Sequence, residues 1–370
     1  MNNKKARVIA FYLPQYHPTP ENDKFWGKGF TEWHNVAKAR PLFKGHEQPK
    51  LPADLGFYDL RLPLVREQQA QLAREAGVEG FMYWHYWFGN GVMTLKDVFE
   101  EVLHTGYPDF PFCLGWANHS WTNKSWGGTK YKGGSTIFEM KYPGVKDYED
   151  HFNYCLPAFL DKRYIRVEGK PIFLIWQPKT MPDVREFMEY WRKRALESGL
   201  PGLHFVGIGE ATESEIKQFK EYGFDAINSF HQQYAENRAI GSIFFKKVRS
   251  IISNLTKGRF INILKKYDYS KVARNLILDV DKNDSIYPTI LSGYDRSPRS
   301  GKNAQIYCNY TPDSFESHVN SAIDAVKDKD DEHKIIFLKS WNEWAEGNYM
   351  EPDTRYGHAF LEVLKKAIFK

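Results

Sequence analysis

Two glutamates near the C-terminal end, Glu343 and Glu346, carry carboxyl groups at a spacing suited to acid–base catalysis. They lie in the run Trp341-Asn-Glu-Trp-Ala-Glu-Gly347. Carboxylates three residues apart lie on one side of a helical turn, with Cβ atoms about 5–6 Å apart. Retaining glycosidases hold their two carboxyl groups about 5–5.5 Å apart, too close for the water of an inverting enzyme. Crowding beside Trp341 and Trp344 should raise the pKa of one carboxyl and leave the other ionised. A bare pair at this spacing is more often a solvated helix face, but the flanking tryptophans and glycine favour acid–base catalysis on a glycosidic bond.

An alternation of two kinds of segment predicts the strands and helices that hold this pair. Short apolar, β-branched and aromatic runs alternate with longer segments of helical period, which is typical of βα units around a parallel sheet. The predicted strands are 8–13, 80–86, 110–116, 171–176, 204–208, 226–230, 287–291 and 334–340. Residues 234–284, between the sixth and seventh strands, are predicted to be a helical insertion. Eight repeats with no glycine-rich phosphate loop after the first strand favour one α/β domain over residues 1–370, a (β/α)8 TIM-like barrel, rather than a doubly wound sheet.

Polar and aromatic side chains follow nearly every predicted strand. Active sites of such barrels lie at the C-terminal ends of the strands, so we expect these side chains to face one pocket. A wet pocket lined by aromatic rings suits a sugar, because ring faces stack on tryptophan and hydroxyls need donors and acceptors. The substrate-binding residues predicted at these strand ends are Tyr16, His17, Trp84, His85, Tyr86, Trp116, Asn118, Trp121, Glu210, His231, Tyr294, Asp295, Asn342 and Trp344.

Four histidines at the strand ends raise the question of a metal. They are His17, His85, His119 and His231. Neither a His-x-His after the first strand nor an HExxH motif accompanies them, so contacts with sugar hydroxyls are favoured over metal ligation. We predict no metal and no cofactor.

Two further patterns give only weak indications of a metal site. The DxD formed by Asp279 and Asp281 is a pattern with which many nucleotide-sugar transferases hold a divalent ion. It falls in the insertion rather than at a strand end, so a solvated turn is favoured. The three cysteines, Cys113, Cys155 and Cys308, are odd in number and far apart, which indicates core cysteines rather than disulfides or a thiolate metal site.

Charge and hydropathy limit the partners. The 51 basic and 46 acidic residues give a net charge of +5, too even a balance to indicate nucleic acid. No apolar run approaches the roughly 20 residues that cross a bilayer, and the apolar stretch 8–13 is shorter than the core of a secretory signal, about 7–15 residues. We expect a soluble, cytoplasmic protein whose partner is an oligosaccharide or polysaccharide, with no nucleic-acid partner.

The insertion is unusually basic. Its lysines and arginines are Arg238, Lys246, Lys247, Arg249, Lys257, Arg259, Lys265, Lys266, Lys271 and Arg274. Apolar residues are interleaved with them, so residues 238–274 could lie on an anionic membrane, which would place the protein at the inner membrane face. The alternative is a helical hairpin that packs its apolar side on the barrel, because an insertion of this length must bury something to stay ordered.

Several motifs resemble the glycoside hydrolase family 99-like group, which includes the WbsX-type proteins of bacterial polysaccharide gene clusters, commonly labelled glycosyltransferases. The matching blocks are 11–17 (FYLPQYH), 26–33 with Glu32 and Trp33, 80–87 (GFMYWHYW), 116–118 (WAN), 293–295 (GYD) and 341–347 (WNEWAEG) with Glu351 and Pro352. The resemblance spans nearly the whole barrel, and it adds Glu32 and Trp33 to the predicted substrate-binding residues.

The resemblance also implies roles for the two glutamates. In the endo-acting α-mannosidases of that family the first Glu of the motif deprotonates the sugar 2-hydroxyl, which attacks the anomeric carbon to give a 1,2-anhydro sugar. Carried over, Glu343 is the base and Glu346 the general acid/base. The function implied is a retaining glycoside hydrolase acting on a 1,2-trans bond of α-manno or α-rhamno type. The alternatives are a WbsX-type glycosyltransferase of O-antigen or capsular polysaccharide biosynthesis, and a non-catalytic carbohydrate-binding barrel, against which the glutamate pair argues.

Overall fold

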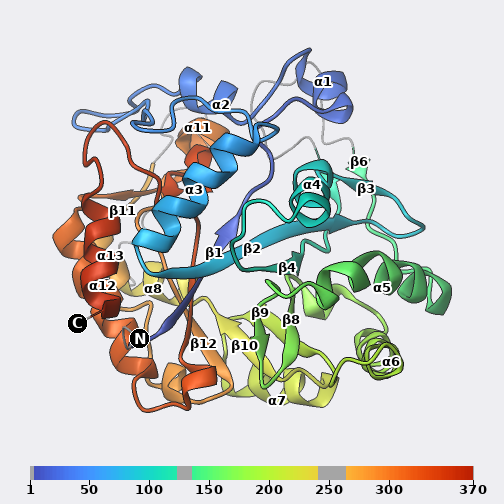
Figure 1. Ribbon diagram of the computed structural model, residues 1–370. Helices are drawn as coiled ribbons and strands as arrows, with labels where there is room; N and C mark the ends of the chain where they lie inside the picture. The colour runs from blue at the N-terminus through green and yellow to red at the C-terminus, as the bar shows by residue number, and fades with distance from the viewer. Residues whose placement is uncertain (1–3, 123–135, 241–263, 370) are drawn as a thin grey trace, which may run out of the picture.

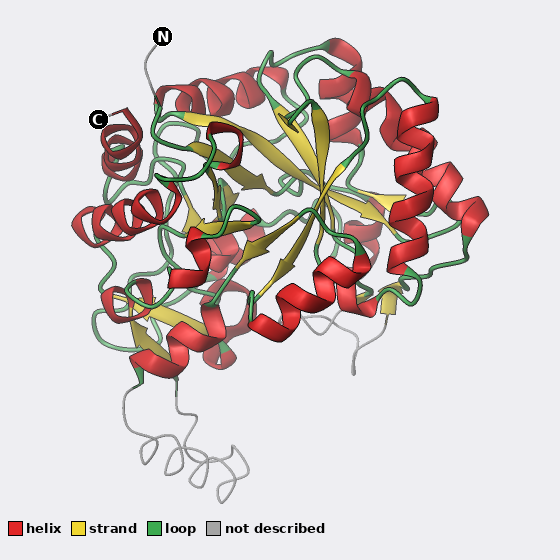
Figure 2. Ribbon diagram, turned by 90° about the horizontal axis from the view of Figure 1, so that it is seen from below, coloured by secondary structure: helices red, strands yellow, loops and turns green. Residues whose placement is uncertain are grey.

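Eight parallel strands form a closed ring in the computed structural model, which describes residues 4–122, 136–240 and 264–369 (Figures 1 and 2). They are β1 (Arg7–Tyr12), β2 (Val78–Trp87), β4 (Phe112–Trp116), β8 (Lys170–Ile175), β9 (His204–Gly209), β10 (Ala226–Ser229), β12 (Ile286–Ile290) and β14 (Ile335–Leu338). Hydrogen-bonded neighbours run β1-β14-β12-β10-β9-β8-β4-β2, and β1 also pairs with β2, so the sheet has no open edge. The predicted (β/α)8 barrel is confirmed, and each predicted strand overlaps one of these eight.

Helices surround the ring, as the view in Figure 2 shows. They are α3 (Pro63–Glu75), α4 (Asp97–Thr105), α5 (Val145–Leu160), α6 (Val184–Glu197), α7 (Glu213–Tyr222), α8 (Gln232–Ala239), α10 (Tyr269–Ala273), α12 (Pro312–Val326) and α13 (Ala359–Phe369). Local sequence sets their ends. Helix α12, for example, begins with Thr311, whose side chain accepts a hydrogen bond from the amide of Ser314, and with Pro312 in the first turn.

The barrel core is apolar because the strands are covered on both faces. The interior is filled by side chains of the strands, and the outer face is covered by the helices. Rings pack on both faces of the sheet: the ring centroids of Phe11 and Phe337 lie 5.6 Å apart. On the side of α3, the ring centroids of Phe81 and Trp341 lie 5.3 Å apart. Every residue of β4, β12 and β14 is buried. This packing fixes the directions in which the strand ends point.

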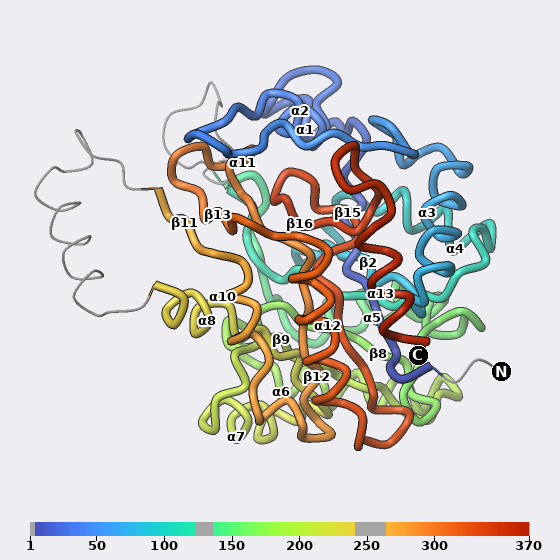
Figure 3. Tube along the Cα trace, turned by 90° about the vertical axis from the view of Figure 1, so that its left-hand side faces the viewer, coloured from blue at the N-terminus to red at the C-terminus, as the bar shows by residue number. Residues whose placement is uncertain are grey.

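Short elements extend the C-terminal ends of the strands. They include α1 (Pro20–Trp26), α2 (Trp33–Lys38), β3 (Met93–Thr94), β5 (Trp121–Thr122), β6 (Thr136–Phe138), α11 (Ser297–Ser300), β15 (Asn342–Glu343), the 3-10 turn η6 (Trp344–Glu346) and β16 (Asn348–Tyr349). Figures 1 and 3 place α1, α2 and α11 at one end of the barrel and α7 at the other. The predicted catalytic turn therefore lies among elements contributed by distant parts of the chain.

The remaining short elements lie in the connections between strands and helices. They are β7 (Arg166–Val167), η2 (Pro178–Thr180), β11 (Lys265–Asp268), η3 (Asp279–Lys282), η4 (Gly301–Asn303), β13 (Gln305–Cys308) and η5 (Asp331–His333). Strands β11 and β13 form a separate two-stranded parallel sheet beside the barrel.

The basic insertion is described in part. Helix α8, strand β11 and helix α10 belong to it, and the apolar residues of α10 pack with those of α8 in a small cluster against the barrel. Lys246, Lys247, Arg249, Lys257 and Arg259 lie outside the described residues, so the predicted membrane contact stays a prediction. Among the described residues, none of the helices has the length and apolar character needed to cross a bilayer.

Candidate active site

A pocket of about 490 Å³ lies at the C-terminal ends of the strands and is called the barrel pocket below. Its aromatic lining is Phe11, Trp26, Trp84, Tyr86, Trp121, Trp176, Phe230 and Tyr294. Its charged lining is Arg296, Arg299, Lys339, Glu343 and Glu346. Apolar walls around a few converging polar groups are the usual composition of a small-ligand site. The barrel pocket therefore combines flat rings for sugar faces with a dense group of ionisable side chains.

The two glutamates converge on a single guanidinium group. Arg299 donates from Nη2 to Oε2 of Glu343 at 2.9 Å and from Nη1 to Oε1 of Glu346 at 2.7 Å. Its Nη2 also donates to Oε1 of Glu32 at 2.7 Å. The turn between the glutamates is the 3-10 helix η6, with Glu343 as the residue before its first turn. Arg299 therefore holds both carboxylates on one side of that turn.

Two contacts place Arg299 and the turn relative to one another. The amide of Asp295 donates to the carbonyl of Glu346 at 2.6 Å, which joins the loop before α11 directly to η6. Gly347 ends η6 in the left-handed region, at φ +57, and a Cβ there would lie 2.8 Å from Cβ of Asp295. A side chain at position 347 would therefore be strained and would push the two segments apart.

Burial and the surrounding charges give the two carboxyls different pKa values. Burial raises the pKa of Glu343 to about 7, with further repulsion from Glu346 and Glu32. Burial alone would also raise the pKa of Glu346. The positive charges of Arg299, Arg296 and Lys339 outweigh burial and hold that pKa below its ordinary value. The Glu343 carboxyl therefore changes its charge near neutral pH, whereas Glu346 is ionised there.

The Trp341–Gly347 segment is pinned to the end of the first strand. The side-chain oxygen of Asn342 accepts from the amide of Leu13 at 2.8 Å, and its nitrogen donates to the carbonyl of Leu13 at 3.0 Å. The hydroxyl of Tyr16 donates to the carbonyl of Asn342 and accepts from the amide of Trp344. Tyr16, Asn342 and Trp344, predicted as substrate-binding residues, are thus buried behind the pocket and hold the turn that carries Glu343 and Glu346.

A buried carboxyl, Glu351, anchors the rest of this segment. It accepts hydrogen bonds from the indole of Trp344 at 2.6 Å, the hydroxyl of Tyr58 at 2.9 Å and the side chain of Gln69 at 2.6 Å. Trp344 also stacks on Tyr349, with ring centroids 3.7 Å apart. Trp344 is 1% exposed, so its ring has no face available to a sugar.

Four of the predicted substrate-binding residues line the barrel pocket: Trp84, Tyr86, Trp121 and Tyr294. The ring of Trp84 meets that of Trp176 edge-on at 5.3 Å, and Tyr86 meets Trp121 at 5.1 Å. Trp84, Trp121 and Trp176 keep part of their surface exposed, so their rings remain available to a ligand. These aromatic pairs form the wall expected for sugar stacking.

Other predicted residues support the charged group rather than line the pocket. Glu32 is fully buried and pairs with Arg299. Asp295 accepts from Gln48 at 2.7 Å and pairs with His46 at 2.8 Å. Trp33 is buried and donates its indole N–H to the carbonyl of Tyr58 at 2.8 Å. The blocks that carry the family resemblance therefore build the frame around the glutamates.

Three strand-end residues expected in the pocket are turned into the barrel wall. Trp116 donates its indole N–H to the carbonyl of Trp87. Asn118 donates to the carbonyl of Gln177 and accepts from its amide. His85 faces His151 of α5. Their polar atoms are satisfied by protein groups, so they are absent from the pocket lining although they lie at the C-terminal ends of β2 and β4.

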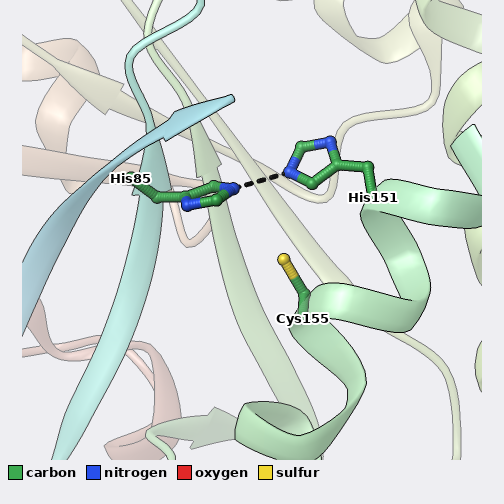
Figure 4. Close-up of side chains that lie close together, drawn as sticks. All are labelled: His85, His151 and Cys155. Carbon is green, nitrogen blue, oxygen red and sulfur yellow. Dashed lines mark hydrogen bonds between the residues drawn. The ribbon is translucent and has the colours of Figure 1, made fainter. Parts of the chain in front are cut away.

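His85, His151 and Cys155 form a buried group of possible metal ligands, with the atoms concerned within 4.8 Å of one another (Figure 4). The Nε2 atoms of the two histidines are 2.7 Å apart and share a hydrogen bond. Burial lowers the pKa of His85 to about 3 and raises that of the Cys155 thiol, so the three groups are uncharged at neutral pH. The ring of His151 stacks on Trp87 with centroids 4.6 Å apart. As it stands, the group is a satisfied part of the aromatic core.

The remaining predicted residues lie around the pocket margin or the core. Glu210 is half-buried and does not line the pocket, and burial raises its pKa. His17 is buried. His231 lies 3.4 Å from the carboxylate of Asp281, which is fully buried and accepts from the hydroxyl of Ser229. The interpretation of the DxD as a solvated turn is therefore wrong for Asp281, because the serine and the histidine bind it inside the barrel wall.

Sequence reasoning missed the three cations of the pocket, Arg296, Arg299 and Lys339. Lys339 directly follows β14, so the rule that barrel sites lie at strand ends could have found it; the predicted strand instead ran through it. Arg299 follows Asp295 by four residues on α11, and nothing in the sequence indicated that α11 folds back on the glutamates. Their positions depend on the packing of α11, α2 and η6.

Comparison with known proteins decides the family. Residues 8–364 match the family described as Glycosyltransferase WbsX. The chain belongs to the WbsX family. It is similar to the protein named WxcX in two strains of Xanthomonas campestris pv. campestris, B100 and ATCC 33913, with 31% identity over 364 residues and 98% of this chain. This WbsX family chain spans about half the length of those curated relatives, 50% of each.

Solved structures agree on the architecture of this WbsX chain. A glycoside hydrolase-like protein shares 15% identity with a TM-score of 0.64, covering 100% of this chain and 95% of that one. The GH99 endo-α-mannosidase of Bacteroides thetaiotaomicron shares 15% identity over 98% of this chain and 95% of its own, with TM-scores of 0.54 and 0.51 in two structures. At this identity the likeness establishes the shared barrel fold. The family match confirms the resemblance to WbsX-type proteins that was drawn from the sequence motifs, and the GH99 structures share the barrel fold.

Proposed function

We propose that this chain is a carbohydrate-active enzyme that breaks or transfers a 1,2-trans glycosidic bond of α-manno or α-rhamno type with retention of configuration. The observation that carries the proposal is the convergence of Glu343 and Glu346 on Arg299 at the edge of an aromatic pocket. Two carboxyls with separated pKa values are the machinery of retaining glycosyl chemistry. The family and the fold support a carbohydrate substrate.

The proposed first step uses the sugar's own 2-hydroxyl as nucleophile. Glu343 accepts the 2-hydroxyl proton, the 2-oxygen bonds to the anomeric carbon, and the bond to the leaving oxygen breaks as Glu346 gives that oxygen a proton. In the second step water or an acceptor hydroxyl gives its proton to Glu346 and attacks the anomeric carbon. The bond to the 2-oxygen then breaks, and that oxygen recovers its proton from Glu343. Because attack comes from the opposite face, the 2-hydroxyl and the leaving group must be trans.

The pKa of Glu343 suits the first role. A general base works best when its pKa lies near the operating pH, and burial raises the pKa of Glu343 to about 7. Glu346 is less well suited to act as an acid in the pocket as described. Its carboxylate lies 2.7 Å from Nη1 of Arg299 and 3.2 Å from Nε of Arg296, and both cations favour the ionised form.

That double ion pair favours a second candidate function, transfer from a donor whose leaving group departs without a proton. A glycosyl phosphate or diphosphate has such a leaving group. An ionised Glu346 would then serve only as the base for the acceptor hydroxyl. The family's description as glycosyltransferases is consistent with this candidate.

Substrate analogues that differ at the 2-position test the proposal. We would incubate the protein with aryl α-mannosides, aryl α-rhamnosides and the corresponding glycosyl phosphates, and follow the anomeric proton of the first product by NMR. Retained configuration is expected from the α-linked substrates. Matched 2-deoxy glycosides should not react, because they lack the nucleophile. Turnover of the 2-deoxy compounds at a comparable rate, or an inverted product, would contradict the mechanism.

A further inference from the structure

Lys339 brings a positive charge into the barrel pocket without an obvious protein partner. It follows β14 and lines the pocket beside the glutamates. Within the described parts of the chain, its ammonium takes part in none of the hydrogen bonds or salt bridges seen in the pocket. It instead lies over three rings, 4.3 Å from the centroid of Phe230, 5.5 Å from Tyr294 and 6.0 Å from Trp176. Aromatic faces attract a cation, but they leave its N–H donors unused.

Arg296 offers a second unused donor in the same pocket. Its Nε lies 3.2 Å from Oε1 of Glu346, an ion pair by distance. The geometry does not make a hydrogen bond, and this buried nitrogen has no hydrogen-bond acceptor among the described residues. Burying a charged donor without a hydrogen-bond acceptor costs free energy. Arg296 and Lys339 both line the barrel pocket, so the two cations face a common space.

The charges of the pocket do not explain both donors. Three carboxylates, Glu32, Glu343 and Glu346, gather around Arg299. All three accept hydrogen bonds from Arg299, whereas Nε of Arg296 donates to none of them.

We propose that Lys339 and Arg296 form a subsite for one anionic group of the substrate, a carboxylate or a phosphate, next to the bond that reacts. Lysine ammonium and arginine N–H groups make charge-assisted hydrogen bonds with such anions. The group could be the leaving phosphate of a glycosyl phosphate or the carboxylate of a uronic acid. The inference rests on the proposed function, since it assumes that the barrel pocket binds a sugar.

A purely internal role for Lys339 would have a different signature. The lysine lowers the pKa of both glutamates, so it could serve only to tune them. In that case its removal would alter neutral and anionic ligands alike. An anion subsite predicts a loss confined to ligands that carry the charge.

Matched ligand pairs separate these roles. NMR titrations of the intact protein compare the affinities of three ligands. The neutral ligand is methyl α-mannoside, and the two anionic ligands are methyl α-mannosiduronate, in which a carboxylate replaces the hydroxymethyl group, and α-mannose 1-phosphate. We expect one anionic ligand to bind about 10- to 100-fold more tightly than the neutral one, the usual gain from hydrogen bonds to charged groups. Preference for the uronate places the charge on the sugar ring, and preference for the phosphate places it on the leaving group.

Three variants assign the effect. Lys339→Met should abolish most of the preference for the anionic ligand, and Lys339→Arg should keep it. Lys217 is exposed on α7, so Lys217→Met makes the same change in net charge away from the pocket and should leave the preference unchanged. Circular dichroism establishes that each variant is folded. An equal affinity of wild type for all three ligands, or an unchanged preference in folded Lys339→Met, overturns the subsite. Binding of the neutral glycoside alone leaves the proposed function standing, whereas binding of no glycoside overturns both.

Discussion

Nη1 of Arg299 lies 2.7 Å from Oε1 of Glu346, and the same guanidinium reaches Glu343 and Glu32. One buried cation thus organises three carboxylates that would otherwise repel one another. Arginine suits this position because its planar fork presents several donors at fixed angles and keeps its charge when buried. The contact between α11 and the turn that carries Glu343 and Glu346 is therefore both structural and electrostatic.

Replacing the two glutamates should separate their roles. Glu346→Gln should abolish turnover of substrates with poor leaving groups and spare activated aryl glycosides more, since protonation of the leaving oxygen is worth roughly 10²–10⁴-fold. Glu343→Gln should impair both kinds of substrate, because it removes the base that activates the 2-hydroxyl. Rates on a matched pair of good and poor leaving groups measure this. An equal loss in both variants on the activated substrate contradicts the division of roles.

The pH dependence should report Glu343. With an activated aryl glycoside, whose leaving group needs no proton, the first step depends on the ionised form of Glu343 alone, so kcat/KM should rise with pH through a value of about 7. The charged groups that act on this carboxyl are Arg299, Lys339, Glu346 and Glu32. Lys339 lowers the pKa of Glu343, and Lys339→Met should therefore move the rising limb to higher pH. A limb that stays in place in that variant, measured with a neutral substrate, excludes this coupling.

Loss of Arg299 should destabilise the fold strongly. Arg299→Met leaves Glu32 and Glu343 buried without their cation, and breaking a buried ion pair costs about 3–5 kcal/mol. Arg61→Met is the matched control, because Arg61 pairs with Asp59 at 2.6 Å on the exposed surface. An exposed pair contributes about 0–1 kcal/mol. Urea unfolding of both variants at pH 8 should show the difference, and equal free energies of unfolding would refute it.

Chelation should leave turnover unchanged. The proposed route uses carboxylates and the substrate hydroxyl, and His85 and His151 already share a hydrogen bond with one another. Activity is compared before and after dialysis against EDTA, with metal content measured by mass spectrometry. A loss of activity after dialysis that added Zn²⁺ reverses would instead indicate a metal held by His85, His151 and Cys155. In that case a Cys155→Ala variant should show no further loss of activity on dialysis.

The basic insertion should bind anionic vesicles if residues 238–274 form a membrane-facing surface. Each lysine or arginine near an anionic surface contributes about 1 kcal/mol at low salt. Neutralising Lys246, Lys247, Arg249, Lys265 and Lys266 should release the protein while turnover of small substrates persists. Co-sedimentation with anionic and with neutral liposomes measures this. Equal pelleting of variant and wild type, or pelleting of neither, leaves the insertion as a structural element only.

The barrel and the place of the glutamate pair at the end of its last strand could be predicted from local sequence patterns. Strand and helix patterns depend on local alternation of apolar and polar residues, so the eight strands could be placed to within a few residues. The Trp341–Gly347 segment singled out Glu343 and Glu346 because a dense local motif carried them. Both kinds of signal are contained in short stretches of chain.

Local patterns could not predict which strand-end side chains line the pocket or which charges surround the glutamates, because these depend on packing between distant segments. Trp84 and His85 are neighbours in β2, yet one lines the pocket and the other hydrogen-bonds to His151, because successive side chains of a strand point to opposite faces. Arg299 reaches Glu32 and Glu346 from 267 and 47 residues away. Such contacts depend on how α11, α2 and the catalytic turn pack together, and no local pattern in the sequence specifies that packing.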